Sequence, residues 1–158
     1  MANNIISPAE VLVLAFSDGG YVAPEAVGEV DIAAAIERWI SPVVGEALLE
    51  AVQGGEYAEL KSEYLQPAVA AYVRLAIQPR LNAATSQLGL YTPNSSHLKA
   101  ADEATRRELM RSLRTRASTL LRRMSTYLEQ NKESIKEYKS GDNILNRCSY
   151  DGGFIQIF

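Results

Sequence analysis

Apolar positions recur at helical spacing in five stretches of the chain, and this pattern predicts an all-α fold. The first stretch opens at Ser7, which can cap a helix, followed by Pro8 in the first turn and by Glu10, which can complete a capping box. The second runs over 31–40, and Ser41-Pro42 is expected to separate it from the third, over 43–52, which should end at Gly54-Gly55.

The fourth stretch, residues 67–77, is apolar at almost every position, which is typical of a helix surrounded by others. We therefore expect it at the centre of a bundle. Pro79 should kink or end this helix, and residues 89–96 are expected to form a loop. A short strand over 69–73 is the alternative, but the sequence offers no flanking strands to pair with it.

The fifth and longest helix is predicted from about Asp102 to Asn131. Its apolar positions fall within one arc of about 120°. The expected fold is a bundle of about five helices with a long amphipathic C-terminal helix and no central sheet. The core should contain Trp39, Leu48, Val69, Tyr72, Val73, Leu113, Leu120 and Met124.

The last segment has a different character, because Gly152-Gly153 precede five residues of high β propensity and no charge. A single strand needs a second strand to satisfy its backbone hydrogen bonds, and an exposed unpaired strand promotes aggregation. We divide the chain into a helical domain, 1–142, and a docking tail, 143–158, whose contact residues are Phe154, Ile155, Ile157 and Phe158. The tail either folds back onto its own bundle or adds a strand to another subunit, and both readings stay open.

Length and composition fit one globular domain, with 158 residues, 47% hydrophobic and 22% charged. No window reaches the roughly 18 apolar residues of a membrane span, and Met1-Ala2-Asn3-Asn4 lacks the basic start of a signal peptide. Cys148 is the one cysteine, so it can form no internal disulfide and, with only His97 beside it, no usual zinc set. A reducing compartment is expected.

The net charge of −3 conceals a segregation of the two signs. Residues 1–100 hold 5 Lys or Arg against 11 Asp or Glu, whereas residues 101–158 hold 11 against 8. Seven arginines and a single acid, Glu108, lie between positions 106 and 123. Four of them share one side of the predicted helix and form a candidate interaction surface, called the Arg face: Arg107, Arg111, Arg114 and Arg122. Arginine suits phosphate recognition, but a solvated face that meets acidic protein is the favoured reading.

Enzyme signatures are absent from the sequence, which has no glycine-rich phosphate loop, no metal-binding histidine pair and no nucleophile elbow. His97 in a polar loop is expected to be solvated, and Cys148 to be incidental. Glu46 and Glu50, one helical turn apart, are expected on a solvated face. We predict no catalytic residue, metal or cofactor, and no enzymatic activity.

Three motifs in order resemble a known family. The first runs from Ile36 through Trp39-Ile40-Ser41-Pro42-Val43-Val44-Gly45 to Leu48, and is similar to the aromatic-Ile-x-Pro-x-aliphatic-Gly-x-x-Leu signature of a Bacteroidetes prophage family related to head–tail connector and head-completion proteins. The second, residues 67–72, is similar to that family's Pro-Ala-Leu-Ala helix start. The third is the amphipathic helix containing Ala117, Leu120, Leu121, Tyr127 and Leu128.

The resemblance implies an adaptor without catalytic residues that forms a homo-oligomeric ring beneath the capsid portal, passes DNA and carries the tail. Its expected partners are itself, the portal and tail-side proteins, with possible non-specific DNA contact and no membrane. Its expected location is the bacterial host cytoplasm during assembly and then the virion. The alternative is a nucleic-acid-binding helical protein that uses the Arg-rich helix 106–123.

Overall fold

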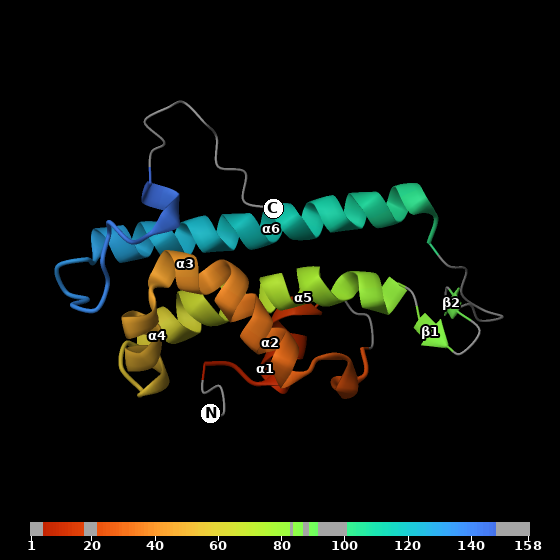
Figure 1. Ribbon diagram of the computed structural model, residues 1–158, viewed down its shortest axis with the longest axis horizontal. Coiled ribbons are helices and arrows are strands. Elements are labelled where there is room, and N and C mark those ends of the chain that lie inside the picture. The colour runs from red at the N-terminus through yellow and green to blue at the C-terminus, as the bar shows by residue number, and fades with distance from the viewer. Residues whose placement is uncertain (1–4, 18–21, 83, 87–88, 92–100, 148–158) are drawn as a thin grey trace.

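Helices account for most of the chain in the computed structural model, which describes residues 5–17, 22–82, 84–86, 89–91 and 101–147 (Figure 1). The predicted all-α bundle is confirmed. Its elements are α1 Pro8–Ala15, η1 Pro24–Ala26, α2 Glu29–Ala35, η2 Ile36–Ile40, α3 Ser41–Val44, α4 Glu46–Gln53, η3 Leu60–Leu65, α5 Gln66–Asn82, β1 Ala84–Ser86, β2 Gly89–Tyr91, α6 Glu103–Gln130 and η4 Ile144–Asn146. Since η2 joins α2 to α3 without a break and η3 runs into α5, these elements make up about five helical bodies.

Helix α5 lies at the centre, as its uniformly apolar sequence predicts. It contacts α1 and α2 on one side and runs antiparallel to α6 on the other (Figure 1). Residues 69–73 lie within this helix, so the alternative of a strand there is excluded, and every residue from Ala68 to Arg74 is buried. The long helix α6 begins where predicted, because the side chain of Asp102 accepts a hydrogen bond from the Thr105 N–H at 2.8 Å and caps it.

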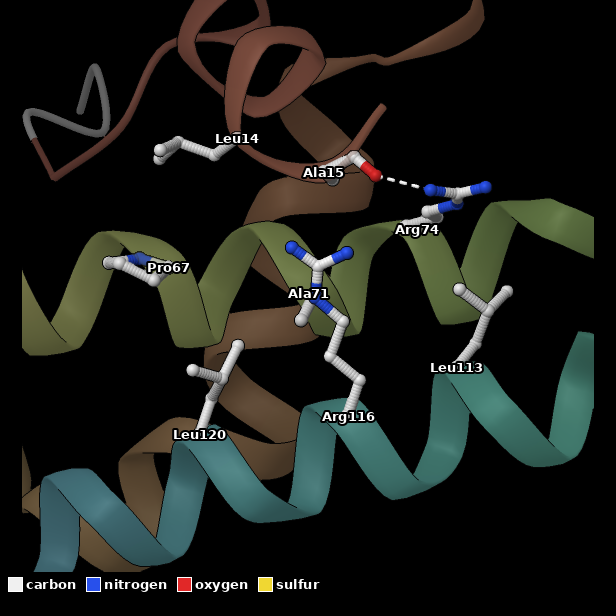
Figure 2. Close-up of a pocket in the computed structure, with 8 residues that line it drawn as sticks. All are labelled: Leu14, Ala15, Pro67, Ala71, Arg74, Leu113, Arg116 and Leu120. Atoms are coloured by element: carbon white, nitrogen blue, oxygen red, sulfur yellow. Dashed lines mark hydrogen bonds between the residues drawn. The ribbon is translucent and has the colours of Figure 1, made fainter. Parts of the chain in front are cut away.

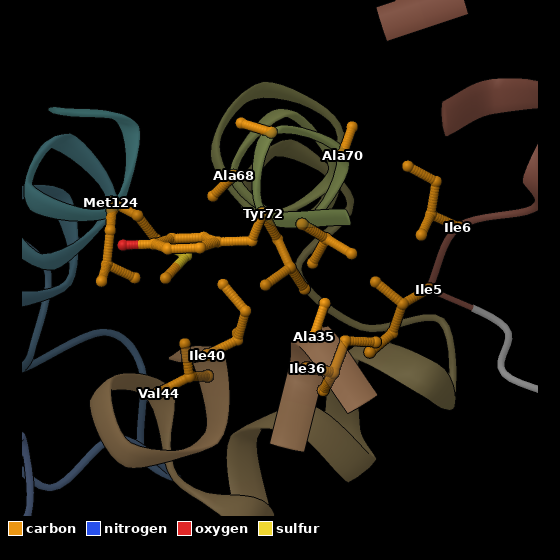
Figure 3. Close-up of a cluster of buried hydrophobic side chains, with 14 of the residues drawn as sticks. Ile5, Ile6, Ala35, Ile36, Ile40, Val44, Ala68, Ala70, Tyr72 and Met124 are labelled. Carbon is orange, nitrogen blue, oxygen red and sulfur yellow. The ribbon is translucent and has the colours of Figure 1, made fainter. Parts of the chain in front are cut away.

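The core joins the α2–η2–α3 body, α5 and α6 (Figure 3). In this view Tyr72 of α5 lies between Ile40 and Met124, and its ring stacks on Trp39 with centroids 4.9 Å apart. Six of the eight predicted core residues are buried, whereas Trp39 and Leu120 are only partly buried against the cluster. Each fully buried Leu or Ile here stabilises the fold by about 1.5–3 kcal/mol.

The predicted helix break at Ser41-Pro42 is wrong. The helix continues through Pro42 to Val44, because η2 is a π-helical turn in which the Ser41 N–H bonds to the carbonyl of Ile36. A wider turn of this kind accommodates the missing N–H and the bulk of a proline ring. The break falls at Gly45 instead, where φ is +84° and ψ is 151°, a backbone conformation that favours glycine.

Pro79 does not end α5 either, since the helix runs on to Asn82. Ile77 and Gln78 are buried on one side, and Arg80 ties the last turn to Asp31 and to the Ala26 carbonyl. These contacts hold the turn that the proline weakens. The predicted loop over 89–96 is also wrong at its start, because residues 89–91 pair antiparallel with 84–86 as a two-stranded hairpin. The hairpin lies at one end of the bundle, beyond the end of α5 (Figure 1).

The chain after α6 turns back onto the bundle. Asn143 is buried, donating hydrogen bonds to the Ser125 hydroxyl at 2.9 Å and to the Tyr138 hydroxyl at 2.8 Å. Asn146 donates to the Glu129 carboxylate. The last described residue, Arg147, is therefore held close to the C-terminal part of α6.

Candidate interaction surfaces

The Arg face occupies one flank of α6. At 100° per residue its four side chains span about 80° of the helix surface, to one side of the buried stripe that contains Leu113, Ala117 and Leu121. All four arginines are exposed. Arg107 pairs with the exposed Glu103 one turn earlier, a contact that contributes little because both groups are solvated. The face is thus open to a partner, and the nature of that partner stays a prediction.

The arginines outside the Arg face lie in different surroundings. Arg123 lies over the ring of Tyr64, 5.0 Å from its centroid, and Tyr64 in turn stacks on Tyr127 at 4.1 Å. These contacts join α6 to η3. Arg123 therefore contributes to packing between elements as well as to surface charge.

A small depression opens between α1, α5 and α6 on the opposite flank of α6 (Figure 2). Its volume is about 160 Å³. The lining is apolar apart from two arginines: Leu14, Ala15, Pro67, Ala71, Arg74, Leu113, Arg116 and Leu120. Its described lining residues carry no carboxylate, imidazole, thiol or hydroxyl group, so they offer apolar contact and positive charge without an acid–base pair or a nucleophile.

Arg74 in this depression has a structural role. It is 8% exposed, its guanidinium donates to the Ala15 carbonyl at the last residue of α1, and it lies 4.7 Å from the centroid of the Phe16 ring. A cation at the C-terminus of a helix satisfies a free carbonyl and opposes the helix dipole. Figure 2 shows Arg116 reaching from α6 toward Ala71 of α5, and Arg116 is exposed.

Five exposed glutamates lie in α4, in η3 and in the segment between them, and we call this group the acidic end: Glu46, Glu50, Glu56, Glu59 and Glu63. Lys61 is the only basic residue between positions 46 and 63. Three contacts place this segment beside the C-terminal end of α6. The Tyr57 hydroxyl donates to Glu137 at 2.5 Å, Tyr64 stacks on Tyr127, and Glu46 shares a surface hollow with Lys139.

The acidic end and most of the Arg face are too far apart to neutralise each other within one subunit. Tyr127, which marks the acidic end, follows Arg114 by 13 residues and Arg107 by 20, or about 20 to 30 Å at 1.5 Å per residue. The Debye length at physiological ionic strength is about 8 Å. Arg107 and Arg114 are therefore not neutralised by the acidic end of their own subunit.

The titratable groups with shifted pKa values lie mainly in structural contacts. Burial, together with the hydrogen bond to Glu129, raises the pKa of Tyr138 to about 12. The hydrogen bond from Tyr138 is in turn the main reason that the pKa of Glu129 is lowered. This network fastens the chain after α6 to the helix. Nowhere in the described part of the chain do three His, Cys, Asp or Glu residues gather as metal ligands would.

Of the other residues singled out from the sequence, some lie in the described part of the chain and some lie outside it. Glu46 and Glu50 are exposed in α4, in agreement with the solvated face expected for them. His97, Cys148 and the contact residues Phe154, Ile155, Ile157 and Phe158 lie outside the described residues. None of the described helices is long and apolar enough to cross a membrane.

Two features of this surface were missed from the sequence alone. The acidic end was detectable in part, because Glu56, Glu59 and Glu63 follow helical spacing and the first 100 residues hold most of the acids. The hairpin carried a weaker signal, in that Thr85, Leu90 and Tyr91 favour strands and Gly89 begins the second strand. Strands of three residues are too short for alternation to reveal them.

Comparison with known proteins gives one match. The model of a family described as a family of unknown function, DUF6712, matches residues 40–147. This range covers about two thirds of the 158 residues, so the chain belongs to that family. No curated protein and no solved structure matches the chain.

Proposed function

We propose that this member of the DUF6712 family is a structural phage protein, a head–tail connector that assembles as a ring under the portal. In this role it provides a passage for DNA and a platform for the tail. It acts in the bacterial host cytoplasm during assembly and afterwards in the virion. The proposal begins from the three sequence motifs that resemble prophage connectors, from Ile36 to Leu128.

The structural observation that carries the proposal is the placement of opposite charges at separate parts of the subunit. The Arg face has three of its four members in the first twelve residues of α6, whereas the acidic end lies beside the last residues of that helix. A surface that complements a different surface of the next copy generates a head-to-tail contact. Repeated head-to-tail contacts close into a ring when the rotation between copies is a whole fraction of a turn.

Native mass spectrometry of the full chain tests the proposal. A connector should give one discrete mass that is a multiple of the 17.3 kDa chain, and negative-stain electron microscopy should show rings with a central opening. Raising the salt concentration should dissociate the assembly, because contacts between exposed charges are screened. A monomer at all protein concentrations and at low salt would contradict the ring.

The exposed Arg face also favours a second candidate, a helical protein that binds nucleic acid directly. Four guanidinium groups within about 80° of one helix could follow a phosphate backbone. In that case the logarithm of DNA affinity should fall linearly with the logarithm of salt concentration, with a slope close to the number of phosphates contacted. A DNA-binding monomer with such a slope would favour this candidate over the connector.

A further inference from the structure

We infer that residues 154–158 of one copy add a strand to the β1–β2 hairpin of a neighbouring copy. The inference rests on the proposed self-association and names a contact that would carry it. Among the described residues the hairpin is the only sheet, with the pairs Ala84 to Tyr91, Thr85 to Leu90 and Ser86 to Gly89.

An isolated two-stranded hairpin is at most marginally stable in water, and a third strand is a common way to stabilise it. Each of its strands pairs on one side with the other, and no further strand of the described part of the chain pairs with the opposite edge. The hairpin thus supplies what a strand-forming segment lacks, namely a ladder of backbone donors and acceptors. This is the geometry of recognition by strand addition.

The sequence Phe-Ile-Gln-Ile-Phe at 154–158 favours a strand, and a single strand requires another strand to pair with. It is uncharged, rich in β-branched and aromatic residues, and free of proline. The preceding Gly152-Gly153 permits a change of direction between the bundle and a docked strand.

The length of the chain decides between the same copy and a neighbouring one. The last described residue, Arg147, directly follows Asn146, which is hydrogen-bonded to Glu129. The hairpin lies near the other end of α6, whose first residue, Glu103, is 26 residues or about 39 Å along the helix from Glu129 (Figure 1).

Phe154 follows Arg147 by seven positions, and a fully extended chain covers at most about 23 to 25 Å in seven steps. Even with several ångströms added for the side chains that join Asn146 to Glu129, Phe154 cannot start a strand along the hairpin of its own subunit. The acceptor is therefore a second copy.

The charges at the two ends of α6 favour the same head-to-tail arrangement of copies. Arg147 and the acidic end both lie at the C-terminal end of α6, and the hairpin lies near its N-terminal end, where Arg107, Arg111 and Arg114 are exposed. A tail that docks on the hairpin of the next copy thus brings the acidic end of the first toward the Arg face of the second. Strand addition and charge complementarity then stabilise the same head-to-tail contact.

Cross-linking between tagged full-length chains tests this docking. In a Cys148→Ser background, one chain carries Thr85→Cys or Leu90→Cys and the other, with a different mass tag, carries Gln156→Cys. A short bis-maleimide should join the two chains into a mixed dimer. A chain that carries Thr85→Cys alone, and one that carries Lys132→Cys with the Gln156→Cys partner, are the controls and should give at least tenfold less product.

Three outcomes would overturn the inference. One is a cross-link within a single chain in a further variant that carries both Thr85→Cys and Gln156→Cys, which would place the tail on its own hairpin. Another is a dimer of the Thr85→Cys chain with itself, which would show hairpin-to-hairpin contact. The third is an assembly of normal mass without the mixed cross-link, which would leave the connector proposal standing and remove only the docking.

A substitution pair provides a second measurement. Ile155→Pro with Gln156→Pro removes two neighbouring backbone donors, so one of them is lost from the ladder in either register. This variant should lose the assembled mass while keeping the melting temperature of the subunit within about 2 °C. Ile155→Val with Gln156→Thr preserves strand propensity and should assemble normally. If the proline pair assembles like the parent, the tail does not dock as a strand.

Discussion

Arg80 near the end of α5 binds both carboxylate oxygens of Asp31 in α2, with Nη1 3.1 Å from Oδ1 and Nη2 2.8 Å from Oδ2. The same Nη2 also donates to the Ala26 carbonyl, and Asp31 accepts the Gly28 N–H at 2.9 Å. One ion pair thus fixes the loop before α2, the first turn of α2 and the turn that follows Pro79 in α5. Two-pronged pairs of this kind are the geometrically specific form of a salt bridge.

The first prediction concerns the pH dependence of this pair. The hydrogen bond from Arg80 is the main reason that the pKa of Asp31 is lowered. A lowered folded-state pKa means that the pair stabilises the fold at neutral pH and that this stability is lost as the pH falls through the folded-state value. Asp31→Asn should therefore lower the free energy of unfolding by about 1 kcal/mol near pH 7. The difference from the parent should shrink below about pH 4.

Denaturant unfolding of both proteins at pH 7 and at pH 3 provides the measurement. Asp142→Asn is the matched control, because Asp142 is exposed and should give no difference beyond a few tenths of a kcal/mol at either pH. An Asp31→Asn defect of constant size across this range would show that the carboxylate charge is not what stabilises the contact.

The second prediction concerns Gly45, which ends α3 with φ at +84° and ψ at 151°. A Cβ at this position would meet no atom within 4 Å, so any cost of Gly45→Ala is backbone strain alone. This region of backbone space is nearly restricted to glycine, and the substitution should cost about 1–3 kcal/mol. Gly141→Ala, also in open space but without a positive φ, should be neutral or slightly stabilising in thermal unfolding. Equal melting temperatures for the two variants would contradict this assignment.

The third prediction concerns the attachment of the chain after α6. Asn143 is 1% exposed and donates to two hydroxyl groups, while its Oδ1 accepts the Leu145 N–H at 2.9 Å. Asn143→Ala removes these three hydrogen bonds, although the Tyr138 hydroxyl keeps its bond to Glu129, and should cost about 1–3 kcal/mol. Asp142→Ala, on the exposed neighbour, serves as the control. Hydrogen exchange should show faster exchange of residues 138–146 in the Asn143 variant, and unchanged exchange there would mean that the segment is held by other contacts.

The fourth prediction concerns the Arg face. Replacing Arg107, Arg111, Arg114 and Arg122 together by alanine should hardly change the melting temperature, because exposed charges contribute about 0–1 kcal/mol each. The mass of the assembly should fall to that of the monomer. The matched quadruple Arg→Lys variant keeps the charge and should assemble at least in part, with any deficit reporting the planar geometry of the guanidinium. If the alanine variant assembles and packages DNA like its parent, the Arg face is a solvent-exposed surface that contacts no partner.

The parts of the fold that local chemistry determines were predictable from the sequence. Ser7 and Glu10 form the expected capping box, with the Ser7 N–H donating to Glu10 Oε2 at 2.7 Å. Helix α6 begins at about Asp102 as predicted, and most of the apolar run of 67–77 is buried in α5. Each of these signals lies within a few residues of the structure that it specifies.

Two of the errors concern prolines that do not end their helices. Pro42 remains inside a helix since the π turn at 36–40 precedes it, and Pro79 does so since Arg80 and Ile77 anchor the turn around it. The position of the acidic end could not be predicted either, because it depends on Tyr57 and Tyr64 packing against the chain near the end of α6. No spacing in the sequence records that contact.

The central claim is that copies meet head to tail through the Arg face and the acidic end, and a charge exchange between two variants tests it most directly. One variant carries glutamate at positions 107, 111, 114 and 122, and the other carries lysine in place of Glu46, Glu50, Glu59 and Glu63. At low salt each variant alone presents like charges to its own copies and should remain monomeric by native mass spectrometry. Their equimolar mixture should form assemblies that contain both chains in equal number. If the mixture stays monomeric under conditions in which the parent assembles, or if either variant assembles alone as the parent does, the head-to-tail contact through these charges is contradicted.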